Sequence, residues 1–153
     1  MTGATRHPVL ALCRADGYEI SSDPARLDVD RVYDWLSTDA YWALGRTRES
    51  VKRSIENSLA AGVYRSSDGR QVAVARMVTD YATFAWLCDV YVDRSVRGAG
   101  LGRWLAGALC DHIRSFGVYR LLLATNDAHG LYDKLGFRPM SNADRWMELE
   151  TSR

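Results

Sequence analysis

The sequence lacks an excess of charge of either sign, and this limits the partners that it can attract. Its 153 residues include 20 lysines and arginines and 19 aspartates and glutamates, which leaves a formal net charge of +1. A nucleic-acid-binding domain normally concentrates its basic residues on one face or in one run. The basic residues here form no such run, so the composition predicts no nucleic-acid partner.

Long hydrophobic runs and a cysteine pattern are also missing. No stretch reaches 18 consecutive apolar residues, and no basic segment followed by an apolar one opens the chain. The three cysteines, Cys13, Cys88 and Cys110, are odd in number and match no zinc or redox spacing. Free thiols are typical of a reducing compartment. The sequence therefore predicts a cytoplasmic protein with no membrane contact and no metal.

The remaining composition, 47% hydrophobic and 25% charged, is typical of a soluble globular protein without repeats. A chain of this length normally forms one domain, which buries about 70% of its unfolded surface and needs no disulfide or metal. The first 16 residues show no clear periodicity. We therefore expect a loose N-terminal tail over residues 1–16 and a single domain over residues 17–153.

Hydrophobic periodicity in that domain predicts a mixture of strands and helices. Strands are expected over residues 18–21, 63–65, 71–79, 82–92, 119–124, 137–139 and 145–150. Helices are expected after a cap at Asp28 or Asp30, after Thr47 as far as Gly62, over 101–116 and over 127–135. This order predicts an α/β (α+β) protein, in which a mixed central sheet of six to seven strands has helices on both faces.

A glycine-rich turn follows the most apolar strand and opens a helix. The segment Val90–Arg103 reads VYVDRSVRGAGLGR. Glycines let the backbone approach a ligand closely and adopt a positive φ. The bare N–H groups and the dipole of the helix that follows suit a phosphate. Three glycines and two arginines carry this prediction: Gly98, Gly100, Gly102, Arg97 and Arg103.

Two common nucleotide-binding motifs do not fit the turn. A dinucleotide-binding turn needs a third glycine at its sixth position, where this chain has Arg103. It also needs an acidic residue about 20 positions further on, where this chain has Arg120, Leu121 and Leu122. The ATP-type phosphate loop needs Gly-Lys-Ser/Thr, and the turn has no lysine. Specific residues therefore exclude both.

The segment Arg97–Gly102 resembles the Arg/Gln-x-x-Gly-x-Gly/Ala signature of the GNAT superfamily of N-acetyltransferases. The segment Leu131–Phe137, LYDKLGF, resembles the Leu-Tyr-x-x-x-Gly-Phe box of the same family. The resemblance covers residues 18–150. Within the family, the sequence is most similar to an uncharacterised bacterial branch. It implies acetyl-CoA as cosubstrate and a splay between the expected strands 82–92 and 119–124, with the thioester in the gap.

The resemblance also implies which residues contact the cosubstrate. The glycine turn would hold the pyrophosphate, and the backbone of Val90–Val92 would pair with the pantetheine amides as a strand does. The family asparagine that contacts coenzyme A corresponds here to Thr125, with Asn126 beside it. The full expected set is Val90, Tyr91, Val92, Arg97, Gly98, Ala99, Gly100, Leu101, Gly102, Arg103 and Asn126.

Tyr132 matches the family tyrosine that donates a proton or a hydrogen bond to the leaving thiolate. With a phenol pKa near 10 and a thiol pKa near 8.5, full proton transfer is uphill by ~2 kcal/mol. We therefore expect the Tyr132 hydroxyl to stabilise the leaving sulfur by a hydrogen bond. Full proton transfer to the sulfur is the alternative if the pocket shifts the pKa of the phenol or of the thiol. The alternative is a packed aromatic side chain on the expected helix 127–135.

The attacking amine must lose a proton, because an amine of pKa near 10.4 is neutral only about once in a few thousand molecules at pH 7. Asp89 is the sole charge in its expected strand. It could act as a base, bind the amine, or form a structural ion pair with an arginine. His129, three residues before Tyr132, is a second candidate base. Weaker candidates are Asp80 and Asp127, and a water relay is a further alternative.

Aromatic residues in and around the first two helices are the expected acceptor pocket, because an aromatic face attracts an ammonium group. The acceptor candidates are Tyr33, Tyr41, Trp42 and Tyr81, whereas Trp35 and Trp86 are expected in the core. The sequence thus predicts transfer of an acetyl group from acetyl-CoA to a primary amine, most simply of a small molecule. A protein or peptide N-acetyltransferase and a non-catalytic acyl-CoA-binding module are the alternatives, and a homodimer is common in the family.

Overall fold

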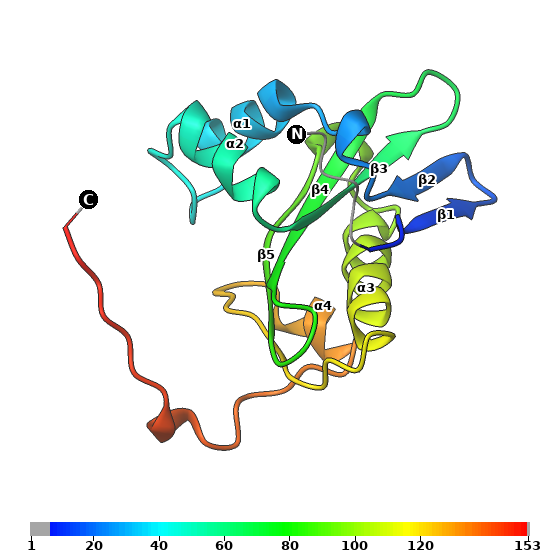
Figure 1. The fold of residues 1–153 in the computed structure, drawn as a ribbon. Helices are drawn as coiled ribbons and strands as arrows, with labels where there is room; N and C mark the ends of the chain where they lie inside the picture. Colours follow the sequence, from blue (N-terminus) through cyan, green and yellow to red (C-terminus); the bar gives the residue numbers. More distant parts are fainter. Residues whose placement is uncertain (1–6, 153) are drawn as a thin grey trace.

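The computed structural model describes residues 7–152, whose strands form one sheet in the order β1-β2-β3-β4-β5-β6 (Figure 1). All neighbouring strands are antiparallel except β5 and β6, which are parallel. The strands are β1 (Ala11–Arg14), β2 (Tyr18–Ser21), β3 (Leu59–Arg65), β4 (Gln71–Thr79), β5 (Ala85–Val92) and β6 (Leu121–Leu122). The helices are α1 (Val29–Thr38), α2 (Arg48–Glu56), α3 (Leu101–Arg114) and α4 (His129–Asp133).

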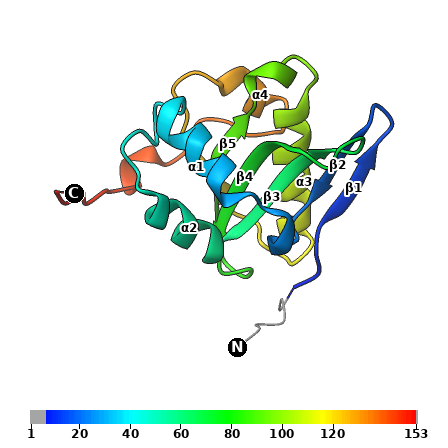
Figure 2. The same ribbon diagram turned by 90° about the horizontal axis from the view of Figure 1, so that it is seen from above.

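Helices cover both faces of this sheet, as expected (Figures 1 and 2). Side chains on a strand point alternately to its two faces, and β4 shows this directly. Ala73 and Ala75 pack in the core with α3, whereas Val74 packs in a second core with α1 and α2. The buried stripe of α3, including Leu105 and Leu109, forms the centre of the larger core.

Side-chain caps fix where the first two helices begin. The Asp28 carboxylate accepts the N–H of Arg31 at 3.0 Å, and the Thr47 hydroxyl accepts the N–H of Ser50 at 3.1 Å. The second helix ends at Glu56, so the prediction that it continues to Gly62 is wrong. Gly62 lies in β3, where a Cβ would stand 2.9 Å from the hydroxyl of Tyr64. This glycine therefore provides space rather than a helix end.

The prediction of a loose tail over residues 1–16 is wrong for residues 11–14, because these residues form β1, which pairs antiparallel with β2. The pairing anchors Arg14, whose guanidinium donates a hydrogen bond to the carbonyl oxygen of Ala99 at 2.8 Å. The first strand therefore supports the glycine turn from 85 residues away. The rest of the expected tail includes residues 1–6, which lie outside the described part of the chain.

The C-terminal strands expected over 137–139 and 145–150 do not form within residues 7–152. From Arg138 to Ser152 the chain is exposed, and its last part stands away from the sheet (Figure 1, orange to red). A strand needs a partner to satisfy its N–H and C=O groups, and alternation of side chains alone does not supply one. The expected strand 119–124 is likewise reduced to the two residues of β6.

Candidate active site

A cleft opens where β5 and β6 separate. The two strands pair only at Ala85 with Leu121 and at Trp86 with Leu122. Beyond these pairs lies a cavity of about 930 Å³, lined by 87–92 on one side and 123–125 on the other. This volume is within the range of small-molecule sites. The splay that the resemblance implied is therefore present, and it makes the largest of the described cavities.

The glycine turn forms one wall of the cleft and is shaped by backbone requirements. Gly98 has φ +91° and Gly100 has φ +72°, a region in which a side chain is strained. Gly102 is helical instead, and a Cβ there would approach the Val92 side chain to 3.3 Å. Helix α3 begins at Leu101 without a side-chain cap, so the N–H groups of its first turn have no intrahelical partner. The first three residues of α3 line the cleft, which makes this wall suited to an anion.

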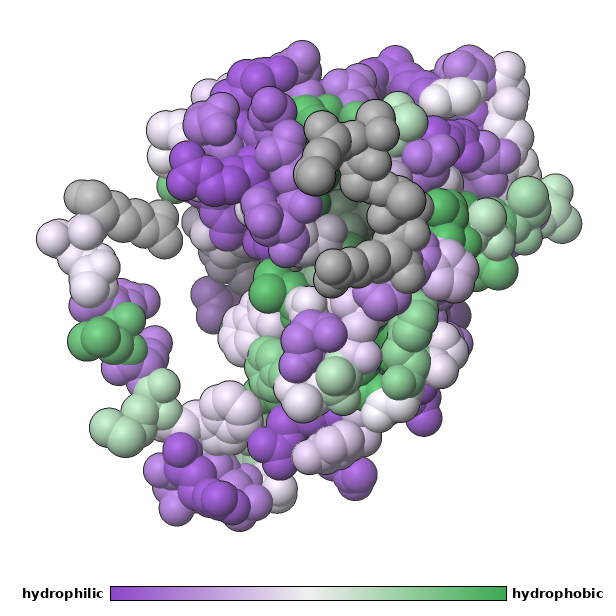
Figure 3. All heavy atoms as spheres, viewed as in Figure 1, coloured by the Kyte–Doolittle hydropathy of each residue, from purple (hydrophilic) through white to green (hydrophobic). Residues whose placement is uncertain are grey.

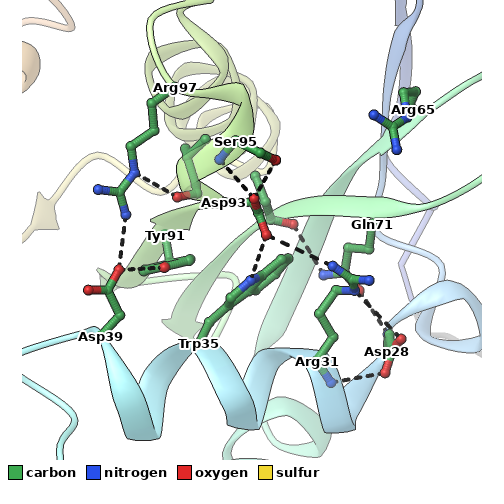
Figure 4. A network of polar contacts seen from close by, with 12 residues as sticks. Asp28, Arg31, Trp35, Asp39, Arg65, Gln71, Tyr91, Asp93, Ser95 and Arg97 are labelled. Carbon is green, nitrogen blue, oxygen red and sulfur yellow. Dashed lines mark hydrogen bonds and ion pairs between the residues drawn. The ribbon is translucent and has the colours of Figure 1, made fainter.

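Arginines beside the turn are held by Asp39, at the C-terminal end of α1 (Figure 4). The Asp39 carboxylate accepts a hydrogen bond from the Tyr91 hydroxyl at 2.6 Å and from Arg97 at 3.3 Å, and it pairs with Arg94. The Arg94 guanidinium, with the Tyr91 hydroxyl, holds the pKa of the Asp39 carboxyl well below its usual range. Arg97 also donates to the carbonyl oxygen of Val92 at 2.9 Å. Asp39 thus orients two cations at the cleft wall.

Asp89 lies at a β-bulge between β4 and β5 and has φ +52°, a conformation that aspartate tolerates better than most residues. Its buried carboxylate accepts hydrogen bonds from Arg46 at 2.8 and 2.9 Å, Arg76 at 3.0 Å and the Trp42 indole at 3.1 Å. Three donor groups thus occupy both carboxylate oxygens through four hydrogen bonds. Of the three roles left open by the sequence, this geometry favours the structural ion pair.

Tyr132 lines the same cleft, from α4. Burial raises the pKa of Tyr132 to about 12, with smaller contributions from Cys110 and Asp127. Its ring packs edge-on against Phe137 at a centroid distance of 6.0 Å. The segment Leu131–Phe137 therefore joins the cleft wall to the body of the protein, and the tyrosine stays protonated at neutral pH.

The expected contact residues divide into two groups. The cleft is lined by Tyr41, Trp42, Asp89, Val90, Tyr91, Val92, Arg97, Gly98, Gly100, Leu101, Gly102, Arg103 and Tyr132. Ala99, Asn126, Tyr33 and Tyr81 do not line it.

Each of these four residues has a different environment. Tyr33 packs against the core of α1 and α2, and Tyr81 stacks on His7 at a centroid distance of 3.7 Å. The prediction of these two tyrosines in the acceptor pocket is therefore wrong. Ala99 accepts the bond from Arg14 described above, and the N–H of Asn126 donates to the Tyr41 hydroxyl at 3.3 Å.

The alternative bases are also placed by the structure. Asp80 uses its carboxylate to accept the N–H groups of Ala82 and Thr83, which closes a turn outside the cleft. His129 is exposed and does not line the cavity, whereas Asp127 does. Three carboxylates line the cleft, and arginines pair with two of them, Asp39 and Asp89. Among residues 7–152, Asp127 is therefore the one lining carboxylate that forms no ion pair with an arginine.

Sequence reasoning missed Asp39, Arg46, Arg76 and Arg94. Arg46 precedes the α2 cap and Asp39 follows α1, and no periodicity marks either. The partners of Arg46 and Asp39 lie 43 to 58 residues away in the sequence. The one signal available was the isolated charge of Asp89, which required a cationic partner that the sequence could not identify.

Comparison with known proteins agrees with this geometry. The model of the acetyltransferase (GNAT) family matches residues 29–137, which include the cleft, the glycine turn and Tyr132. A solved structure from Xanthomonas campestris pv. campestris, provisionally assigned to the same family, is 41% identical with a TM-score of 0.82. That match covers 88% of this chain and 93% of the other.

Two curated proteins are also similar. One, from Gibberella zeae, is provisionally named an acetyltransferase and is 30% identical over 83% of this chain and 82% of its own length. The other, serotonin N-acetyltransferase 2 of Oryza sativa subsp. japonica, is 36% identical over 91% of this chain and 70% of its own length.

The fold, the cleft and the family match thus define an acyltransferase. The chain belongs to the GNAT family of acetyltransferases, whose cosubstrate is acetyl-CoA. Among residues 7–152, no helix combines the length and apolar character needed to span a bilayer.

Proposed function

We propose that this protein transfers the acetyl group of acetyl-CoA to the primary amine of a small molecule by direct attack. The observation that carries the proposal is a single cleft that combines an anion-binding turn, the unpaired part of β5 and Tyr132. The diphosphate would lie on the first turn of α3, and the pantetheine arm would pair with the backbone of Val90–Val92. This path directs the thioester toward the phenol of Tyr132.

A test of the cosubstrate site is Gly100→Val. Valine at φ +72° carries a strain of about 1–2 kcal/mol, and the added side chain crowds the N–H groups of α3. Acetyl-CoA affinity is expected to fall about tenfold to a hundredfold by isothermal titration calorimetry. Gly69 has φ +71° in the β3–β4 turn, also with open space around it. Gly69→Val is therefore the matched control, and equal affinity for the two variants contradicts the site.

Direct attack is supported by the state of the one cysteine in the cleft. Cys88 lines the cavity, and burial raises the pKa of its thiol to about 11. At pH 7 only about one molecule in ten thousand carries the thiolate that an acetyl-enzyme would require. The amine therefore attacks the thioester carbonyl itself, its proton leaves to water, and the released sulfur takes a hydrogen bond from Tyr132.

Cys88→Ala is accordingly expected to keep turnover within about threefold of the wild type, since the thiol takes no part in bond making. Initial-rate kinetics with both substrates varied should give intersecting lines, because both are bound before any product leaves. Parallel lines, together with loss of activity in the alanine variant, would show a covalent intermediate instead.

The acceptor is proposed to be an aromatic or alkyl amine of small size. Tyr41 and Trp42 are half exposed and line the cleft, with ring centroids 5.0 Å apart in an edge-to-face pair. Aromatic faces attract an ammonium group and enclose an apolar substituent. The rice relative is named for serotonin, an aromatic amine, and that name supports testing this class first.

The experiment is a screen of small amines and peptides for amine-dependent release of free coenzyme A from acetyl-CoA. Release with small aromatic amines, and weaker release with peptides, is the expected result. Binding of acetyl-CoA without release for any amine would overturn the enzymatic proposal in favour of a binding module. Preference for a peptide would overturn the small-molecule assignment alone.

A further inference from the structure

Two arginines share a single carboxylate beside the cleft. Asp89 pairs with Arg46 at 2.8 Å and with Arg76 at 3.0 Å. The Arg76 guanidinium also lies 3.5 Å from the hydroxyl of Ser58, which carries no charge. Among residues 7–152, neither arginine pairs with a second acidic side chain. The group therefore carries one positive charge that no side chain compensates, and an anionic ligand would stabilise it.

Arg46 presents this charge to the cleft. It lines the cavity, whereas Arg76 does not. Only its Nη1 group binds Asp89, at 2.9 and 2.8 Å from the two oxygens. An arginine has five N–H donors in one plane, and the Nε and Nη2 donors of Arg46 make no hydrogen bond with residues 7–152. These two nitrogens form one side of the guanidinium group, which can hold a carboxylate or a phosphate through two parallel hydrogen bonds.

The backbone around Arg46 is held in place by the core. The N–H of Arg46 donates to the carbonyl oxygen of Ala43 at 3.2 Å, and the N–H of Ala43 donates to that of Ala40 at 2.9 Å. Ala40 and Ala43 are both buried in the core of α1 and α2. Arg46 is therefore positioned before a ligand arrives, which reduces the entropic cost of binding.

The aromatic side chains proposed for the acceptor lie beside Arg46. The Trp42 indole and the Arg46 guanidinium donate to the same oxygen of Asp89, at 3.1 and 2.9 Å. Tyr41 packs edge-on against Trp42. A small molecule that rests on these two rings is therefore a neighbour of the free donors of Arg46.

The phosphates of acetyl-CoA do not account for the charge of Arg46. Their proposed place is the first turn of α3, which follows the end of β5 at Val92. A strand rises about 3.3 Å per residue, so the Asp89 backbone lies roughly 10 Å before that end. The proposed path of the cosubstrate thus leaves Arg46 available to the second substrate.

We propose that Arg46 is a specificity-determining residue, which selects an acceptor that carries an anionic group, a carboxylate or a phosphate, in addition to its primary amine. The inference rests on the acetyl-transfer function proposed above and narrows its acceptor class. The anion binds Nε and Nη2 of Arg46, the apolar part lies against Tyr41 and Trp42, and the amine remains to attack the thioester. An amine without the anion leaves the two donors unpaired and is selected against.

Pairs of matched amines test this preference through initial rates of coenzyme A release. Tyrosine is compared with tyramine, which lacks only the carboxylate, and phosphoethanolamine with ethanolamine, which lacks only the phosphate. In at least one pair, kcat/KM is expected to be about 10- to 100-fold higher for the anionic member. The selective pair identifies the anion as a carboxylate or a phosphate. Equal or lower values for the anionic member of both pairs overturn the proposal.

Arg46→Gln removes the cation and leaves Asp89 paired one-to-one with Arg76. The ratio of kcat/KM within the selective pair should fall to about one. A ratio compares two substrates of one sample, so partial unfolding does not change it. Arg46→Lys, which keeps a cation for Asp89, is the second variant, and its ratio should fall about tenfold because lysine cannot bind an anion through two fixed donors.

The matched control is Arg53→Gln, on the hydrophilic surface that α1 and α2 present to solvent (Figure 3, purple at the upper left). Arg53 is exposed and does not line the cleft. The control should therefore keep the wild-type ratio. Wild-type ratios in both Arg46 variants overturn the assignment of selectivity to this residue.

Calorimetry separates failure of this inference from failure of the acetyl-transfer proposal, because binding of an amine to the protein saturated with coenzyme A requires no reaction. Tighter binding of the anionic amine, lost in Arg46→Gln, supports the role of Arg46 even where no coenzyme A is released from acetyl-CoA. Release without any preference in rate or binding leaves acetyl transfer standing and overturns this inference. Absence of binding for all four amines also overturns it.

Discussion

Tyr132→Phe is expected to lower kcat about 100-fold while the Kd of acetyl-CoA stays within about twofold. The substitution removes one hydroxyl and keeps the ring, so the packing against Phe137 is retained. What is lost is a hydrogen bond to a sulfur whose negative charge develops only as the thioester bond breaks. An interaction that strengthens only in the transition state affects turnover and not binding of the ground state.

The pKa of Tyr132 decides between the two ways in which its hydroxyl could help. At about 12 it exceeds that of an ordinary thiol, near 8.5, by about 3.5 units. Full transfer of the proton to the departing thiolate is therefore uphill by roughly 5 kcal/mol, more than the ~2 kcal/mol expected for an unshifted phenol. The structure thus strengthens the case for a hydrogen bond that stabilises the thiolate without giving up its proton.

Steady-state kinetics with an amine from the screen, and calorimetry with acetyl-CoA, measure the two quantities separately. Tyr33→Phe is the control, because Tyr33 carries the same hydroxyl but packs away from the cleft on α1. Unchanged turnover in Tyr132→Phe would remove this residue from the mechanism. Equal losses in both variants would indicate a general effect on the fold.

Asp89→Asn is expected to destabilise the protein by about 3 kcal/mol, because removing one partner leaves the charges of Arg46 and Arg76 uncompensated in a largely buried site. Asparagine has the shape of aspartate and tolerates the positive φ of the bulge. The change therefore removes the charge and keeps the backbone. For a chain of this size the midpoint of thermal unfolding should fall by roughly 6–12 °C.

Thermal unfolding by calorimetry measures this effect, with Asp111→Asn as the control. The Asp111 side chain is 82% exposed and lies 3.8 Å from Arg114, whose side chain is 68% exposed, so loss of the Asp111 charge should leave the midpoint unchanged. A stable Asp89→Asn variant with strongly reduced kcat would contradict the structural role and restore Asp89 as a candidate base.

The sequence by itself determined the parts of this protein that depend on local backbone chemistry. Asp28 and Thr47 cap helices because their side chains reach N–H groups three residues on, and Gly98 and Gly100 take a positive φ that other residues avoid. Those requirements are satisfied within a few residues, so the glycine turn, its helix and the motif of Tyr132 could be located without a structure.

Only the tertiary structure decided which distant side chains meet. Asp39 reaches Tyr91 across 52 residues of sequence, and Asp89 reaches Arg46 across 43. The residues 145–150 alternate as a strand does, yet remain unpaired because pairing requires an edge that local sequence cannot supply. Burial and strand register are properties of the whole chain. For that reason the residues alone could not predict which charged side chains pair in the cleft. They also could not predict that Tyr33 and Tyr81 lie outside the cleft, or that β1 anchors the glycine turn.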